Sequence, residues 1–144
     1  MCLRTTASSN SKATCTAAPV RAACTFFSGE NRPSPYAVAS LFLLPSHNEN
    51  FGLVVAEAMA HGVAPLVTDS TPWRFLEREA AGWCVPWDNY GEAIRGATAQ
   101  APHQLSEYGA TAARLVARDF SWDVTARTLN AFYAELSLSP AISP

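Results

Sequence analysis

Two glutamates stand eight residues apart in this chain, with a glycine between them. Glu49 precedes the apolar run 51–61, and Glu57 lies inside it as the only charged residue between Glu49 and Asp69. Because burying an unpaired carboxylate costs several kcal/mol, Glu57 must face solvent or a bonding partner. A carboxylate on the second turn of a helix, aimed toward the helix start, can accept hydrogen bonds from vicinal hydroxyls such as those of a ribose. Glu49, in the loop before that helix, could reach a second polyol.

The residues around the two glutamates have the pattern of a helix that starts just after a strand ends. Pro45 and Ser46 end an apolar run, and Gly52 lies in the first turn of the predicted helix. A helix N-terminus presents unpaired N–H groups and the positive end of the helix dipole, which favour a phosphate. Gly52 lets a ligand approach the backbone closely, because it has no Cβ. In open α/β sheets, ligands bind beyond the carboxyl ends of the strands, where this loop would lie.

The elements that would position these residues alternate between strand and helix. Short apolar runs predict three strands, at residues 40–44, 63–68 and 82–85. Length and end signals predict five helices, at residues 51–61, 71–79, 88–99 and 102–118 and from Ser121 onward. Strands that alternate with helices indicate a parallel α/β sheet flanked by helices.

Apolar residues at three- and four-residue spacing predict a buried face on each of the last two helices. The first face comprises Leu105, Tyr108, Ala112 and Leu115. The second comprises Trp122, Leu129, Phe132 and Leu136.

Composition places the chain among globular proteins and excludes several partners. Apolar residues make up 49% and charged residues 15% of the 144 residues, and the formal net charge is −2. Positive charge is too sparse for a nucleic-acid surface, and no apolar run approaches the roughly 20 residues that cross a bilayer. The four cysteines lack paired spacing, which is typical of a reducing compartment. We therefore expect a cytoplasmic protein with no nucleic-acid partner and no transmembrane segment.

We expect one ordered domain, at residues 36–137. The segment before it begins with a stretch rich in Ala, Ser and Thr, where large apolar side chains are nearly absent. Such a stretch cannot bury enough surface to offset its conformational entropy. A disordered or weakly structured leader is therefore expected at residues 1–35, and a flexible tail at 138–144.

Each candidate residue also has a purely structural interpretation. Glu49 could favour the helix dipole without any ligand, and Glu57 could be an ordinary exposed helix residue. His61 is typical of a partner for a helix C-terminus, and His47 of a polar loop group that lines a site. The four tryptophans and Cys84 are interpreted as packing residues.

The strand end, the spaced glutamates and the helix end together resemble the retaining glycosyltransferases of the GT-B fold, in the large family 4 group. The hallmark of that family is Pro-Ser, then a glutamate, seven residues and a second glutamate, with Phe-Gly-Leu inside and Ala-x-Ala-x-Gly at the helix end. This chain carries Pro45-Ser46, Glu49, Phe51-Gly52-Leu53, Glu57 and the helix end at 58–62. The resemblance continues through 67–73, 81–85 and 120–122, and covers the chain from about Phe26 or Tyr36 to Leu136.

The resemblance implies a Rossmann-like fold and a nucleotide-diphosphate sugar as the donor substrate. Glu49 is then the expected catalytic residue, in contact with hydroxyls of the transferred sugar, and Glu57 holds the ribose hydroxyls. The remaining expected nucleotide-sugar-binding residues are Asn50, Phe51, Gly52 and Leu53, the last three through their backbone N–H groups. Such contacts neutralise the leaving diphosphate, so that no metal or other cofactor is expected. Transfer would retain the anomeric configuration through positioning and electrostatic stabilisation.

The same resemblance implies that this chain holds the larger part of a C-terminal donor-binding domain. The acceptor, a saccharide or a lipid-linked molecule, would bind an N-terminal domain that these residues do not provide. The complete enzyme, a hexosyltransferase of cell-surface polysaccharide biosynthesis, could associate peripherally with a membrane, and this chain alone would be inactive. The alternative is a catalytically inactive remnant that serves at most as a nucleotide-binding or protein-interaction fragment.

Overall fold

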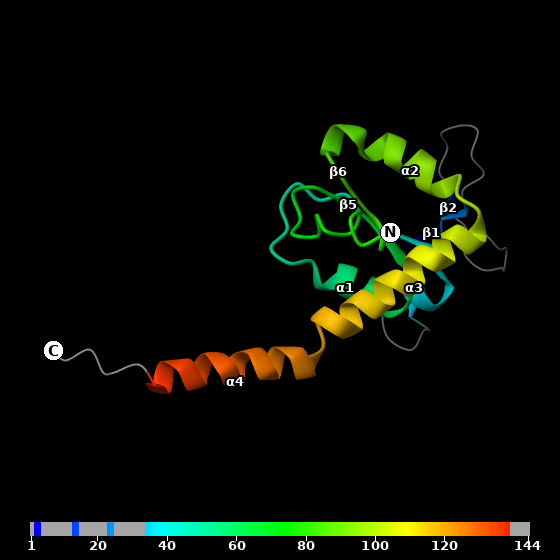
Figure 1. Ribbon diagram of the computed structural model, residues 1–144. Helices are drawn as coiled ribbons and strands as arrows, with labels where there is room; N and C mark the ends of the chain where they lie inside the picture. Colours follow the sequence, from blue (N-terminus) through cyan, green and yellow to red (C-terminus); the bar gives the residue numbers. More distant parts are fainter. Residues whose placement is uncertain (1, 4–12, 15–22, 25–33, 139–144) are drawn as a thin grey trace.

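The computed structural model describes residues 2–3, 13–14, 23–24 and 34–138 (Figure 1). Its strands are β1 (Cys2–Leu3), β2 (Ala13–Thr14), β3 (Ala23–Cys24), β4 (Leu41–Leu44), β5 (Ala64–Thr68) and β6 (Trp83–Val85). Its helices are the 3-10 turns η1 (Pro35–Val38) and η2 (Trp87–Asn89), and α1 (Leu53–Ala60), α2 (Tyr90–Thr98), α3 (Pro102–Asp119) and α4 (Trp122–Leu138). The leader expected at 1–35 and the tail expected at 138–144 fall mostly outside the described residues, and both stay predictions.

Strands β4, β5 and β6 form a parallel sheet, which confirms the predicted α/β class. The strand order is β1-β4-β5-β6, and β1 joins β4 in the antiparallel direction. Leu44 of β4 is in register with Val67 of β5, and Val67 with Cys84 of β6. The carboxyl ends of the three parallel strands therefore meet at one edge of the sheet, the edge from which the loop 45–52 departs.

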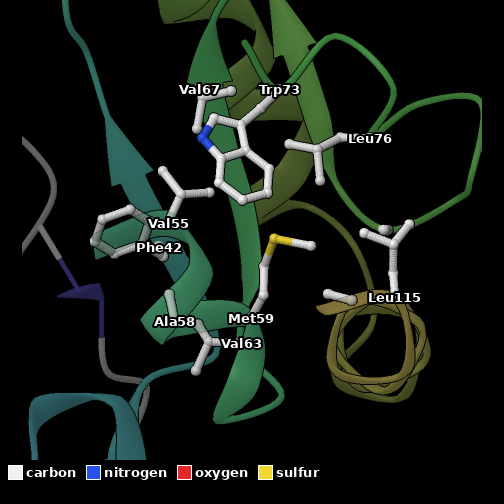
Figure 2. Close-up of a cluster of buried hydrophobic side chains, with 11 residues drawn as sticks. Phe42, Val55, Ala58, Met59, Val63, Val67, Trp73, Leu76 and Leu115 are labelled. Atoms are coloured by element: carbon white, nitrogen blue, oxygen red, sulfur yellow. The ribbon is translucent and has the colours of Figure 1, made fainter. Parts of the chain in front are cut away.

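Successive residues of β4 and β5 alternate between two hydrophobic cores, one on each face of the sheet. Phe42 and Val67 belong to the core that contains α1 residues, and Leu41, Leu43 and Leu66 to the core that contains α2 residues. Figure 1 shows α1 and α2 on opposite sides of the sheet. The first core (Figure 2) comprises Phe42, Val55, Ala58, Met59, Val63, Val67, Trp73, Leu76, Ala81, Ala112 and Leu115.

Helix α3 packs against both cores along the face that its sequence predicts. Leu105 and Tyr108 pack against the second core, and Ala112 and Leu115 are buried in the first. Between them, Gly109 lies so close to the turn after α1 that a Cβ at this position would overlap the Gly62 carbonyl oxygen. The absent side chain is thus what lets α3 reach the end of α1.

The helix predicted at residues 71–79 is wrong, because this segment forms successive turns. The Thr71 hydroxyl donates to the Thr68 carbonyl at 2.8 Å and does not cap a helix. Trp73 and Leu76 are both fully buried in the first core. Their burial overrides the local helix signals, as tertiary packing commonly does.

The face predicted to be buried on α4 is also wrong. Trp122 is 86% exposed, and Leu129, Phe132 and Leu136 are each about half exposed. Figure 1 shows α4 extending away from the sheet. Periodicity identifies the apolar side of a helix, but it does not show which element packs against that side. Ser121 caps the start of α4, since the Val124 N–H donates to Ser121 Oγ at 3.4 Å.

Candidate functional site

The loop at residues 45–52 leaves the carboxyl end of β4 and is tied to the end of β5. The Ser46 N–H donates to Thr68 Oγ1 at 3.3 Å, and the Thr68 hydroxyl donates back to the Ser46 carbonyl. The Ser70 hydroxyl donates to the same carbonyl at 2.5 Å and lies 3.0 Å from Thr68 Oγ1. This network sets the direction of the loop without using any of the predicted site residues.

Helix α1 begins directly after Gly52, which confirms a glycine at the helix start. Gly52 has a left-handed conformation, with φ 73° and ψ 62°, and its carbonyl accepts the Val55 N–H at 2.8 Å. A Cβ at this position would lie 3.2 Å from Glu49 Cγ and 3.4 Å from Trp73 Nε1. The position therefore requires glycine both for its conformation and for the space around it.

Aromatic packing holds the residue before Gly52. The Trp73 indole donates a hydrogen bond to the Phe51 carbonyl, and the centroids of the two rings are 5.2 Å apart. The Phe51 ring also lies 5.7 Å from that of Phe120, at the end of α3. Three segments that are distant in sequence thus converge on the start of α1.

Glu49 lies half-buried on the approach to α1, and Asn50 beside it is exposed. Glu49 Cγ lies 3.2 Å from the position that a Cβ on Gly52 would occupy. Within the described residues, the Glu49 carboxylate forms neither a hydrogen bond nor an ion pair. Its role as a catalytic carboxylate stays a prediction.

Glu57 lies on the second turn of α1, as the sequence predicts, and its side chain is exposed there but has a bonding partner. The Tyr36 hydroxyl, from η1, donates to Glu57 Oε2 at 3.3 Å. His61 Nδ1 lies 2.9 Å from the Glu57 backbone carbonyl oxygen, which confirms His61 as a partner of the helix C-terminus. The Tyr36 and His61 rings are tilted against each other with centroids 5.2 Å apart.

The predicted site residues thus occupy the start and the second turn of one helix. Glu49, Phe51 and Gly52 gather near Trp73, whereas Glu57 bonds to Tyr36. Leu53, in the first turn, is 69% exposed. That one ligand spans both carboxylates stays a prediction.

Sequence reasoning missed a contact at the same edge of the sheet. The His47 imidazole, after β4, stacks on the Trp87 indole, after β6, with centroids 3.5 Å apart and planes 30° apart. Both residues follow the carboxyl ends of parallel strands, and this shared position is the sequence signal that could have placed them at one edge of the sheet. Strand β5 lies between the two strands in the sheet, so the stack joins loops that follow non-adjacent strands.

The remaining electrostatic features involve none of the predicted site residues. Burial raises the pKa of the Cys84 thiol, which agrees with an inert packing residue. The Arg118 guanidinium lowers the pKa of the Asp119 carboxyl through hydrogen bonds.

A cavity of about 280 Å³ is lined by Glu79, Thr111, Arg114, Leu115 and Arg118. Among the described residues, no three His, Cys, Asp or Glu side chains gather as a metal site, and none of the helices is long and apolar enough to span a membrane.

A parallel sheet whose first crossover helix carries Glu57 and follows a loop that carries Glu49 defines part of a Rossmann-like GT-B domain. The solved structure of sucrose-phosphate synthase from Thermosynechococcus elongatus has this fold, with a TM-score of 0.62 and 28% identity over 70% of this chain and 26% of that one. Residues 8–108 match the family described as Glycosyl transferases group 1, and the chain belongs to this family. The matched range includes most of the segment 1–35 that we expected to be a leader.

Two relatives show what share of the length of a family member this chain covers. The D-inositol 3-phosphate glycosyltransferase of Streptomyces bingchenggensis is 34% identical over 104 residues, which are 69% of this chain and 22% of that protein. The glycogen synthase of Lachnoclostridium phytofermentans is 28% identical over 121 residues, which are 77% of this chain and 25% of that protein. The chain therefore spans about a quarter of the length of the curated relatives that it matches.

Proposed function

We propose that this chain carries part of the donor site of a retaining glycosyltransferase that uses a nucleotide-diphosphate sugar. One observation carries the proposal. A left-handed glycine opens α1 at the carboxyl end of β4, with Glu49 before it and Glu57 one turn beyond it. The first amides of a helix have no acceptor within the helix, and such amides suit an anionic ligand.

Each residue then has a distinct role. The backbone N–H groups of Phe51, Gly52 and Leu53 bind the diphosphate and the sugar. The Glu57 carboxylate accepts hydrogen bonds from the ribose hydroxyls, and Glu49 accepts them from the hydroxyls of the transferred sugar. Hydrogen bonds to an ionised carboxylate are stronger than those between neutral groups, which suits a site that must orient two polyols.

In the transfer, the bond between the anomeric carbon and the diphosphate oxygen breaks. A new bond forms from that carbon to the acceptor oxygen on the same face of the sugar, and the acceptor hydroxyl gives its proton to the leaving diphosphate oxygen. Preorganised amides at the helix start stabilise the negative charge that develops on the leaving oxygen, so we propose a transfer that needs no metal ion. The transferred group is a hexosyl unit. The acceptor is a saccharide or a lipid-linked molecule of cell-surface polysaccharide biosynthesis, held by a part of the enzyme outside these residues.

Calorimetric titration of the chain with UDP, GDP and their hexose derivatives tests the donor site. We expect one of the two nucleotide classes to bind. Glu57→Gln should weaken that binding by about tenfold or more, because a charge-assisted hydrogen bond is lost. Glu49→Gln should weaken binding of the nucleotide sugar more than binding of the free nucleotide.

Glu107→Gln is the matched control, since Glu107 is an exposed glutamate of α3. It should leave all affinities within about twofold of the parent. Failure of every nucleotide to bind, or equal affinities for Glu57→Gln and Glu107→Gln, would refute the proposed donor site and favour an inactive remnant.

A further inference from the structure

Tyr36 is a residue outside the glutamate motif that contacts Glu57, an exposed residue of the proposed site. It lies in η1, just before β4, and its side chain is half-buried. The ring packs edge-on against Phe42 of β4 with centroids 6.0 Å apart, and it is tilted against His61 at 5.2 Å. Contacts with two separate elements fix the position of the ring, and therefore that of its hydroxyl.

The hydroxyl of Tyr36 reaches the second turn of α1. It donates to Glu57 Oε2 at 3.3 Å and lies 3.5 Å from the Val54 backbone carbonyl oxygen. Glu57 Oε1 has no hydrogen-bond or ion-pair partner among the described residues. The carboxylate is thus held through one oxygen, and its other oxygen is left for a ligand.

The chemical nature of this donor matters for a carboxylate that must bind hydroxyls. A phenol O–H is neutral, so it restricts the rotation of the carboxylate without cancelling its charge. A guanidinium in the same place would compete for both oxygens and offset the negative charge. Within the described chain, none of the ion pairs includes Glu57. No cationic side chain of the described residues therefore pairs with this carboxylate in competition with a diol.

We propose that Tyr36 is a positioning residue that orients the Glu57 carboxylate to receive the vicinal hydroxyls of the donor nucleoside. This inference rests on the proposed function and deepens it. Tyr36 acts on the ligand only through Glu57, so that its effect depends on the ribose hydroxyls and on the Glu57 charge. Preorganisation of the carboxylate lowers the cost of ordering it when the ligand binds.

The test is a cycle of two substitutions and two ligands, measured on the full chain. Tyr36→Phe, Glu57→Gln and the double variant are titrated with the nucleoside diphosphate that binds the parent and with its 2′,3′-dideoxy form. Tyr36→Phe should weaken the ribonucleotide about threefold to tenfold and the dideoxy form less than about twofold. In the Glu57→Gln background, Tyr36→Phe should have no further effect.

Tyr36→Phe keeps the ring that packs on Phe42 and His61, and circular dichroism verifies that the fold is retained. Tyr133→Phe, at an exposed tyrosine of α4, is the matched control and should change neither affinity. If the parent binds nucleotide through Glu57 but Tyr36→Phe weakens both ligands equally, or neither, the positioning role is overturned and the donor site stands. If the parent binds no nucleotide, the proposed function fails and the role of Tyr36 fails with it.

Discussion

The indole Nε1–H of Trp73 donates a hydrogen bond to the backbone carbonyl of Phe51, across 2.5 Å. Trp73 is only 1% exposed and belongs to the first core, where Figure 2 shows its indole. Phe51 is the residue directly before the left-handed Gly52. The start of α1 is therefore anchored by a core residue from the turn segment that follows β5. The glutamate motif depends on a side chain outside the motif.

Trp73→Phe should both destabilise the fold and weaken nucleotide binding. The smaller ring leaves a void in the core, and the Phe51 carbonyl loses its donor, so we expect a loss of about 1–3 kcal/mol in the free energy of unfolding. Urea denaturation followed by circular dichroism measures the change. Trp122→Phe is the matched control, because Trp122 is 86% exposed, and it should cost less than about 0.5 kcal/mol. Equal costs for the two variants would contradict the anchoring role.

Gly52→Ala should damage the proposed site more than the rest of the fold. The new Cβ would meet Glu49, Val55 and Trp73 at 3.2–3.4 Å, and the φ of 73° strains any residue with a side chain. We expect a stability loss of about 1–2 kcal/mol and a further loss of nucleotide affinity. Gly91→Ala has nothing within 4 Å of the new Cβ and should be harmless. Unchanged affinity in Gly52→Ala would show that the ligand does not approach this backbone.

Much of the fold could be predicted from the sequence because its signals are local. Apolar runs predicted β4, β5 and β6, and the left-handed Gly62 after α1 follows from a glycine at the end of a helical stretch. The segment 71–79 could not be predicted, since the burial of Trp73 and Leu76 in a distant core decides its conformation. The same limit applies to α4, where the sequence shows an apolar side but does not show which element would pack against it.

The site could be predicted only in part, for a related reason. Glu49, Gly52 and Glu57 share one loop and helix, so their spacing alone places them near the start of α1. Tyr36 precedes Glu57 by 21 residues and reaches it only because β4 brings η1 alongside α1. The stack of His47 on Trp87 likewise joins loops after two different strands. Contacts that depend on strand order do not appear in local sequence patterns.

Gly109→Ala should destabilise the chain strongly, because its Cβ would overlap the Gly62 carbonyl oxygen where α3 crosses the end of α1. Backbone on both sides must move apart, so we expect a loss of about 2–4 kcal/mol. Gly96→Ala, in α2 with open space around the new Cβ, should instead stabilise by about 0.5–1 kcal/mol, since alanine favours a helix. Thermal unfolding of the two variants beside the parent measures both signs. A neutral Gly109→Ala would show that the two helices do not approach this closely.

Tyr90 should make the fold sensitive to alkaline pH. Its hydroxyl donates to the Leu66 carbonyl at 2.9 Å inside the second core, and burial raises its pKa far above the ordinary value of 10.0. In the unfolded chain the phenol ionises near that ordinary value, whereas in the folded chain it stays protonated. Its contribution to stability is therefore fully present below about pH 10 and is lost as the pH rises further.

Tyr90→Phe should cost about 1 kcal/mol at neutral pH, because the hydrogen bond to Leu66 is lost. The free energy of unfolding of this variant should fall less steeply than that of the parent between about pH 9 and pH 11. Parallel pH profiles for the two proteins, measured by urea denaturation, would show that the Tyr90 phenol ionises equally in both states.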